Sequence, residues 1–151
     1  MNHRIAAGVI VEHEGRILLV RHCKAGAYDF WVAPGGGAQG HEDLLATARR
    51  EVFEESGLHV EPQQLAYVEE FASPQTRECK LWFIGRVIGG SLGSASAEAA
   101  REHIVEAAWL GRSEFAGRTV FPPMLHGAYW QDKQSGFALP RYVGLREMAF
   151  Y

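Results

Sequence analysis

Residues 36–58 read GGAQGHEDLLATARREVFEESGL, and three glutamates in this stretch, Glu51, Glu54 and Glu55, have the i, i+3, i+4 spacing of a helix. That spacing places the three carboxylates on one helix face, within an arc of roughly 100°. Like charges this close repel and raise one another's proton affinity, so we expect a cation among them. Oxygen ligands of this kind suit hard divalent cations, Mg²⁺ or Mn²⁺, better than they suit zinc.

The pattern extends beyond the three glutamates. Five residues separate Gly36 from Glu42, and seven more lead to Arg50. An acidic cluster alone is usually a solvated helix face, but seven fixed residues at set positions should arise by chance on the order of once in 10⁸ starting points. The segment resembles the Nudix box, Gly-x5-Glu-x7-Arg-Glu-U-x-Glu-Glu-x-Gly-U with U aliphatic, and it meets every specified position. The preceding Trp31 to Gly36 is also similar to the tryptophan-proline-diglycine approach of that family.

The hydrophobic pattern predicts an α/β fold with a single domain over residues 1–151. A helix is expected over residues 43–56, with Asp43 as N-cap and Gly57 as the left-handed residue after its end. The other expected elements are strands at 5–11, 17–20, 30–33, 65–71, 79–88 and 104–110, loops at 22–29, 73–76 and 89–96, a helix at 122–133 and a final strand within 137–151. The resemblance implies a Nudix-type α/β/α sandwich around a mixed β-sheet.

The same resemblance implies an enzyme that hydrolyses a phosphoanhydride, with water as the nucleophile. Glu54 and Glu55 would be the main metal ligands, and Glu51 would be a further ligand or would help to deprotonate water. The carbonyl of Gly36 would complete the coordination, since glycine allows close approach of the backbone. Arg50 would orient a neighbouring glutamate, or it would simply form a surface ion pair four residues along the helix.

Many members of this family use one more acidic residue from outside the box. Glu98, Glu102 and Glu106 are the candidates here, and Glu102 is chosen because it just precedes the strand expected at Ile104. The alternative is that all three are solvated surface charges. Within the box, Glu42 lies near the helix start, where negative charge is stabilised, and is assigned a structural role.

Two positions depart from the common family pattern. Gln39 stands where a glutamate is common and His41 where a glycine is common, while Gly40 comes one place early. The loop before the helix is therefore expected to turn differently. The carboxylate set itself is unchanged, so activity is still expected.

The substrate is less well specified by the sequence. Pro74, sixteen residues after Leu58, resembles the ADP-ribose pyrophosphatase subgroup, although a loop proline is more often a simple turn residue. Tyr28 is the candidate for stacking on a base. Arg21 and Arg77 are candidates for holding phosphates, and the alternative for each is an ordinary surface cation.

The sequence is compatible with three classes of function. The favoured one is a Mg²⁺-dependent pyrophosphohydrolase acting on a nucleoside diphosphate linked to another moiety, such as ADP-ribose or a nucleotide sugar. A nucleoside triphosphate pyrophosphatase that sanitises the nucleotide pool is the alternative within the enzyme class. A non-catalytic nucleotide sensor would normally have lost glutamates from the box. An isoprenoid diphosphate isomerase would need a catalytic cysteine, and neither Cys23 nor Cys79 stands out for that role.

Composition narrows the choice of partners. The net charge of −3 gives no basic surface for nucleic acid. The sequence shows no secretory leader and no apolar run of transmembrane length, so a cytoplasmic protein without a membrane partner is expected. The expected partner is a nucleotide-like small molecule. A homodimer is compatible with the resemblance, although nothing in the sequence requires one.

Overall fold

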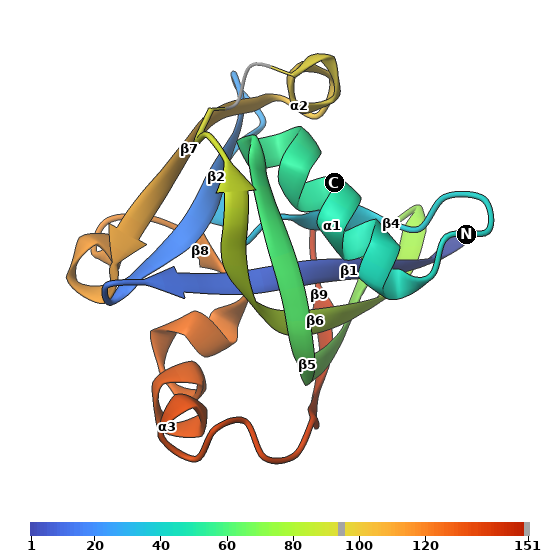
Figure 1. Cartoon of the computed structure of the whole chain (residues 1–151). Helices are drawn as coiled ribbons and strands as arrows, with labels where there is room; N and C mark the ends of the chain where they lie inside the picture. The colour runs from blue at the N-terminus through green and yellow to red at the C-terminus, as the bar shows by residue number, and fades with distance from the viewer. Residues whose placement is uncertain (94–95, 150–151) are drawn as a thin grey trace.

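The computed structural model describes residues 1–93 and 96–149 (Figure 1). The predicted loop at 89–96 and the predicted final strand within 137–151 extend over residues 94–95 and 150–151, which lie outside the described residues. The helices are α1 (Leu44–Ser56), α2 (Ala97–Arg101) and α3 (Ala128–Gln134), with short 3₁₀ turns η1 (Arg112–Phe115) and η2 (Pro123–His126).

A nine-stranded mixed sheet forms the centre of the molecule, with the main strand order β8-β3-β2-β1-β6-β5-β9. Strand β4 pairs with β1, and β7 pairs with β2. The pairs β1–β6, β3–β8 and β5–β9 are parallel, and the remaining pairs are antiparallel. The strands are β1 (Asn2–His13), β2 (Arg16–Lys24), β3 (Tyr28–Val32), β4 (Gly35–Gly37), β5 (Leu58–Ala72), β6 (Thr76–Gly90), β7 (Ile104–Gly111), β8 (Val120–Phe121) and β9 (Arg141–Glu147).

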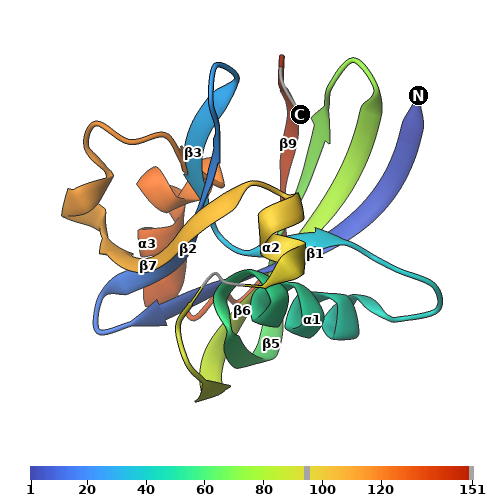
Figure 2. The ribbon, with the colours of Figure 1, turned by 90° about the horizontal axis from the view of Figure 1, so that it is seen from above.

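Two hydrophobic clusters lie on opposite faces of this sheet, because successive side chains of a strand point in opposite directions. Val9 and Val11 of β1 pack with Val52 of α1 in one cluster. Ile10, between them, packs with Tyr129 of α3 in the other. Figure 2 shows α1 and α3 separated by the strands of the sheet. The predicted α/β/α sandwich around a mixed sheet is therefore confirmed.

Helix α1 begins and ends where the sequence predicts. The Asp43 side chain accepts a hydrogen bond from the Ala46 backbone N–H at 2.8 Å and caps the first turn. Gly57 has φ 77°, the left-handed conformation that glycine adopts at little cost after a helix end. These two local signals fix the length of the helix and, with it, the position of each glutamate along the helix.

Several predicted boundaries were wrong. Most of the loop expected at 22–29 is strand, because β2 and β3 continue to pair as far as Lys24 and Tyr28. Strand β5 begins at Leu58 rather than 65 and accommodates Pro62 at a shift in register, where no ladder hydrogen bond is needed. The helix expected at 122–133 consists of η2 and α3, separated at Gly127. Among the described residues, no helix has both the length and the apolar character needed to cross a membrane.

Candidate active site

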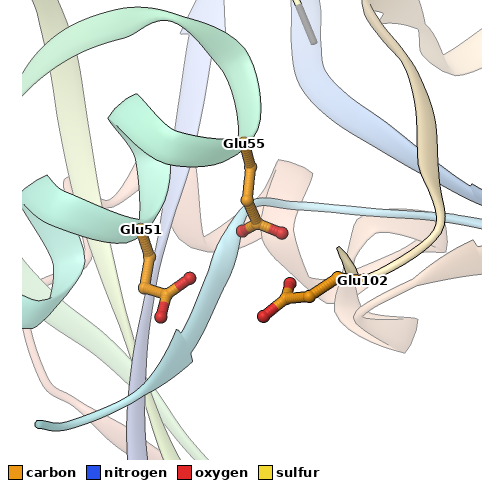
Figure 3. Close-up of side chains that lie close together, drawn as sticks. All are labelled: Glu51, Glu55 and Glu102. Carbon is orange, nitrogen blue, oxygen red and sulfur yellow. The ribbon is translucent and has the colours of Figure 1, made fainter. Parts of the chain in front are cut away.

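Three carboxylates from two separate segments meet beside α1. Glu51 and Glu55 lie one turn apart on the buried side of the helix, with 4% and 2% of their surface exposed. Glu102 follows directly after α2. One carboxylate oxygen from each residue lies within 4.8 Å of the others, and Figure 3 shows the three side chains pointing toward a common space. The end of α1 is joined to the start of α2, because the Ser96 hydroxyl donates to the backbone carbonyl of Glu54.

Strand β4 brings backbone, rather than side chains, against these carboxylates. The Gly35 N–H donates to Oε1 of Glu55 at 2.7 Å. A Cβ added to Gly36 would lie 2.6 Å from the carboxylate carbon of Glu51, closer than real Cβ atoms approach. Glycine at position 36 therefore leaves the space that the Glu51 carboxylate occupies.

Burial and mutual repulsion raise the pKa of each acid in this group. Burial raises the pKa of Glu55 well above its usual range, with Glu102 and Glu51 adding to the effect. Burial is also the main cause of the raised pKa of Glu51, followed by the charge of Glu102. Glu102 counts as exposed by its total surface, but partial burial of its carboxylate is the main cause of its raised pKa, and the charge of Glu54 adds to it. Each group therefore favours its neutral form unless a positive charge is nearby.

These residues fit a hard divalent cation. The Oε2 atom of Glu51 is buried and accepts no hydrogen bond from any residue that the structure describes. Such an oxygen is costly to bury without a partner. An oxygen-only donor set, an acceptor without a donor and mutually repelling charges are all relieved by one cation of the Mg²⁺ or Mn²⁺ type.

Arg50 connects the cluster to the loop before the helix. Its guanidinium donates to Glu42 at 2.6 Å, to Glu51 at 3.0 Å, to Glu54 at 3.2 Å and to the Gly37 carbonyl at 3.0 Å. The hydrogen bonds from Arg50 are the main reason that the pKa of Glu42 is lowered to about 2. Among Glu51, Glu55 and Glu102, only Oε1 of Glu51 pairs with Arg50 within the described structure.

The grouping of the helix acids differs from the expected one. The sequence predicts Glu54 and Glu55 as the main ligands, with Glu51 beside them. In the structure the close group consists of Glu51, Glu55 and Glu102. Glu54 precedes Glu55 by one residue, and its carboxylate is paired with Arg50 instead.

His22 also lies at the cluster, although it belongs to no motif in the sequence. Its Nε2 atom is 3.9 Å from Oε2 of Glu55, and its ring stacks on Phe30 with 5.0 Å between centroids. Burial, and then the charge of Lys80, lower the pKa of His22 to about 4. Two-residue alternation places His22 on the same side of β2 as the buried Val20, and this was the signal in the sequence.

A cleft adjoins the cluster. Gly35, Gly36 and Glu102 line it near the carboxylates. Arg146 of β9 lies over the Phe121 ring, 4.4 Å from its centroid, and pairs with Glu69 at 3.0 Å. Both Arg146 and Glu69 also line the cleft, which therefore extends from the carboxylates to the edge strand β9.

The three predicted substrate-binding residues lie elsewhere, since none lines this cleft as far as the described residues define it. Arg21 makes two hydrogen bonds to Asp29, at 2.9 and 2.7 Å. Arg77 pairs with Glu70 at 2.6 Å. Tyr28 is the first residue of β3 rather than a loop residue, and its ring lies 5.5 Å from the ring of Phe30.

Similar proteins are known from sequence and from structure. The human 8-oxo-dGDP phosphatase NUDT18 is 33% identical over 142 residues, which cover 91% of this chain and 42% of the relative. The chain thus spans about two fifths of the human protein's length. A NUDIX hydrolase from Nitrosomonas europaea superposes with a TM-score of 0.75 at 20% identity, covering 98% of this chain and 81% of that chain. A UDP-X diphosphatase gives 0.71 at 17% identity, covering 97% and 68%.

The family comparison covers most of the elements described above. The NUDIX domain matches residues 1–128, from β1 through η2, and this range includes the complete box and Glu102. The two solved structures share the fold at low identity, and the human relative shares a third of the aligned residues. The chain therefore belongs to the Nudix hydrolase family.

Proposed function

We propose that this chain is a Mg²⁺-dependent pyrophosphohydrolase that cleaves the phosphoanhydride of a nucleoside diphosphate derivative. Mn²⁺ would also activate it. One observation carries the proposal: Glu51, Glu55 and Glu102 converge at one end of a cleft, and a buried oxygen of Glu51 has no donor among the described residues. A set of buried carboxylates with surplus negative charge is poorly explained by packing alone. It is well explained by a metal site that serves a phosphate substrate.

The position of each residue indicates the role proposed for it. Glu51, Glu55 and Glu102 would hold the cation, and the backbone of Gly36 lies next to Glu51. The cation supplies charge neutralisation to the diphosphate. Arg50 would fix the orientation of Glu51 through its 3.0 Å hydrogen bond. Glu54 is proposed as a further ligand beside Arg50, and Glu102, which comes from outside the helix, as the acceptor of a proton from the attacking water.

A nucleoside diphosphate is favoured over a triphosphate as the substrate. The named activity of the human relative concerns 8-oxo-dGDP, a nucleoside diphosphate. The chain would then act either on such a diphosphate directly or on a diphosphate linked to a sugar, as in ADP-ribose. Aromatic rings at Phe71 and Phe121 line the cleft and offer surfaces for a base. Every glutamate of the box is present, which argues against a sensor that binds without hydrolysis.

We also propose that residues 1–151 act as one domain. Strand β9 follows the matched region of residues 1–128, yet it pairs with β5 and contributes Arg146 to the cleft. The C-terminal segment would therefore belong to the same functional unit.

A substrate screen tests the proposed function. ADP-ribose, a UDP-sugar, 8-oxo-dGDP and 8-oxo-dGTP are each incubated with the chain and Mg²⁺ or Mn²⁺. For 8-oxo-dGDP and 8-oxo-dGTP, whose terminal phosphates an added phosphatase would itself remove, released phosphate and pyrophosphate are measured directly. For ADP-ribose and the UDP-sugar, phosphate released only after phosphatase treatment indicates cleavage between the two phosphates. We expect turnover of at least one diphosphate that stops on chelation of the metal. Failure to cleave any of the three diphosphates would contradict the proposal, and cleavage of 8-oxo-dGTP alone would identify a triphosphate pyrophosphatase instead.

A further inference from the structure

Lys80 differs from the two other lysines of this sequence. Lys24 is exposed, and Lys133 pairs with Glu12. Lys80 is buried, with 8% of its surface exposed, and within the described residues it forms neither an ion pair nor a hydrogen bond. A buried cation without a counter-ion is costly to desolvate. Its position therefore calls for an explanation other than packing.

A carboxylate within reach of Lys80 is already engaged. Glu69 of β5 lies directly opposite Lys80 in the β5–β6 pair, so the two side chains project from the same face. Glu69 instead pairs with Arg146 at 3.0 Å. The ammonium of Lys80 lies over the Trp82 ring, 4.3 Å from the centroid.

Lys80 lies next to the carboxylate cluster without joining it. Its side chain passes close to Gly35, since a Cβ there would lie 3.0 Å from Cε of Lys80. The same Gly35 donates its N–H to Glu55. Burial raises the pKa of both Glu55 and Glu102, and the charge of Lys80 partly offsets that rise. Lys80 also lines the same cleft as Gly35 and Glu102. Lys80 thus lies beside the cluster without an ion pair to any of its three carboxylates in the described structure. This arrangement suits an anion that lies between the ammonium and a cation bound at the cluster.

The remaining polar groups of the cleft support this reading. Arg4 pairs with Glu78, and Arg146 pairs with Glu69, so the other cations in the cleft lining have carboxylate partners. Trp82, which carries the Lys80 ammonium on its ring, has a buried indole Nε1–H with no acceptor among the described residues. Two neighbouring donors on β6 are thus unsatisfied beside the same cleft.

We propose that Lys80 is a substrate-binding residue whose ammonium contacts a phosphate oxygen of the diphosphate held at the Glu51–Glu55–Glu102 cluster. This inference rests on the proposed function, since it assigns a further residue to the same site. A charge-assisted contact of this kind is strong when it is partly buried. The unpaired ammonium would then lower stability in the free protein and gain its partner when substrate binds.

The test compares Lys80→Met with Lys80→Arg and with Lys24→Met, which removes the same charge from an exposed position. Binding of inorganic pyrophosphate in excess Mg²⁺ is measured by isothermal titration calorimetry, and thermal unfolding is measured without ligand. We expect Lys80→Met to weaken pyrophosphate binding at least about tenfold, because a desolvated charge contact is lost. Lys80→Arg should recover part of that loss, and Lys24→Met should change nothing. The unfolding midpoint of Lys80→Met should equal or exceed that of the wild type, because a buried unpaired cation is removed.

Wild-type affinity in Lys80→Met would overturn this proposal, and so would a wild-type protein that does not bind pyrophosphate. A lower unfolding midpoint with unchanged binding would show that Lys80 is a structural counter-charge to the glutamates. The substrate screen separates this inference from the proposed function. If no compound is cleaved but Lys80→Met loses pyrophosphate binding, the proposed hydrolysis is wrong, and the assignment of Lys80 as a diphosphate-binding residue is retained. If the wild type hydrolyses a diphosphate and Lys80→Met has the same kcat and KM, the reverse holds.

Discussion

Equally buried acids lie beside one end of the cleft and within the other, but the two groups differ in charge balance. Glu51 and Glu55 are 4% and 2% exposed, and Glu69 and Glu78 at the other end are both 3% exposed. Glu69 and Glu78 each have an arginine partner, Arg146 and Arg4. In the cluster of Glu51, Glu55 and Glu102, Arg50 pairs with Glu51 alone as far as the structure describes. Burial alone therefore does not mark the site; the surplus of buried negative charge does.

Glu55→Gln is expected to have the largest effect on turnover. Loss of one ligand charge should lower kcat by about a thousandfold or more, because neutralisation of the phosphates depends on the bound cation. The unfolding midpoint should rise, since repulsion from Glu51 and Glu102 is relieved. Steady-state kinetics measure the expected fall in kcat, and thermal unfolding measures the expected rise in the unfolding midpoint.

Glu98→Gln is the matched control for Glu55→Gln, because Glu98 of α2 forms a surface pair with Arg101. It should alter neither quantity appreciably. Glu54→Gln should lower kcat less than Glu55→Gln does, because Glu54 lies outside the close group of Glu51, Glu55 and Glu102. Normal turnover of Glu55→Gln with Mg²⁺ would remove the basis for treating the cluster as a metal site.

Gly36→Ala is expected to have an intermediate effect. Its Cβ would displace the Glu51 carboxylate, the mobile end of a side chain, so the fold should survive while Mn²⁺ affinity falls about 10- to 100-fold. Mn²⁺ binding can be followed by electron paramagnetic resonance. Gly111→Ala is the control, because its backbone is extended (φ −76°, ψ 158°) and a Cβ there meets only ordinary van der Waals contacts, the nearest at 3.5 Å. Equal Mn²⁺ affinity in both variants would contradict the close approach of backbone and carboxylate as a requirement of the site.

Arg146→Met should have the smallest effect on turnover and should act mainly on stability. It removes the arginine partner of the buried Glu69 carboxylate, which Lys80, opposite it in the β5–β6 pair, replaces only in part, so the free energy of unfolding should fall by about 2 kcal/mol. Arg21→Met breaks an exposed pair with Asp29 and should cost less than about 1 kcal/mol. Urea unfolding of both variants measures the difference. Equal losses of stability in the two variants would mean that the buried Glu69 carboxylate does not depend on its pair with Arg146.

Local signals in the sequence explain what could be predicted. The caps at Asp43 and Gly57 and the 3.6-residue repeat fix α1, and the spacing of Glu51 and Glu55 places them one turn apart. These features depend on neighbouring residues alone, so they can be read without a structure. The extents of β2, β3 and β5 depend on pairing between strands, and the hydrophobic runs underestimated all three.

The partners of individual charges were not readable from the sequence. Arg21 looked available to a phosphate, but pairing of β2 with β3 places Asp29 within hydrogen-bonding distance of it. Lys80 lies in the strand predicted at 79–88, and nothing in that stretch indicates that Arg146, from the far end of the chain, pairs with the Glu69 carboxylate opposite it. Each of these outcomes depends on strand register, which no local pattern in this sequence specifies.

The hydrogen bond from Ser96 to the Glu54 carbonyl has a consequence for how the third acid could diverge among related chains. The backbone N–H of Gly93 also donates to the Ser56 carbonyl at 2.8 Å, so both sides of the connection are anchored to the last turn of α1. Ser96 is also the N-cap of α2, so its contact with α1 sets where Glu102, at the other end of that helix, arrives. A related chain that replaced Ser96 would have a different cation affinity although every glutamate remained in place.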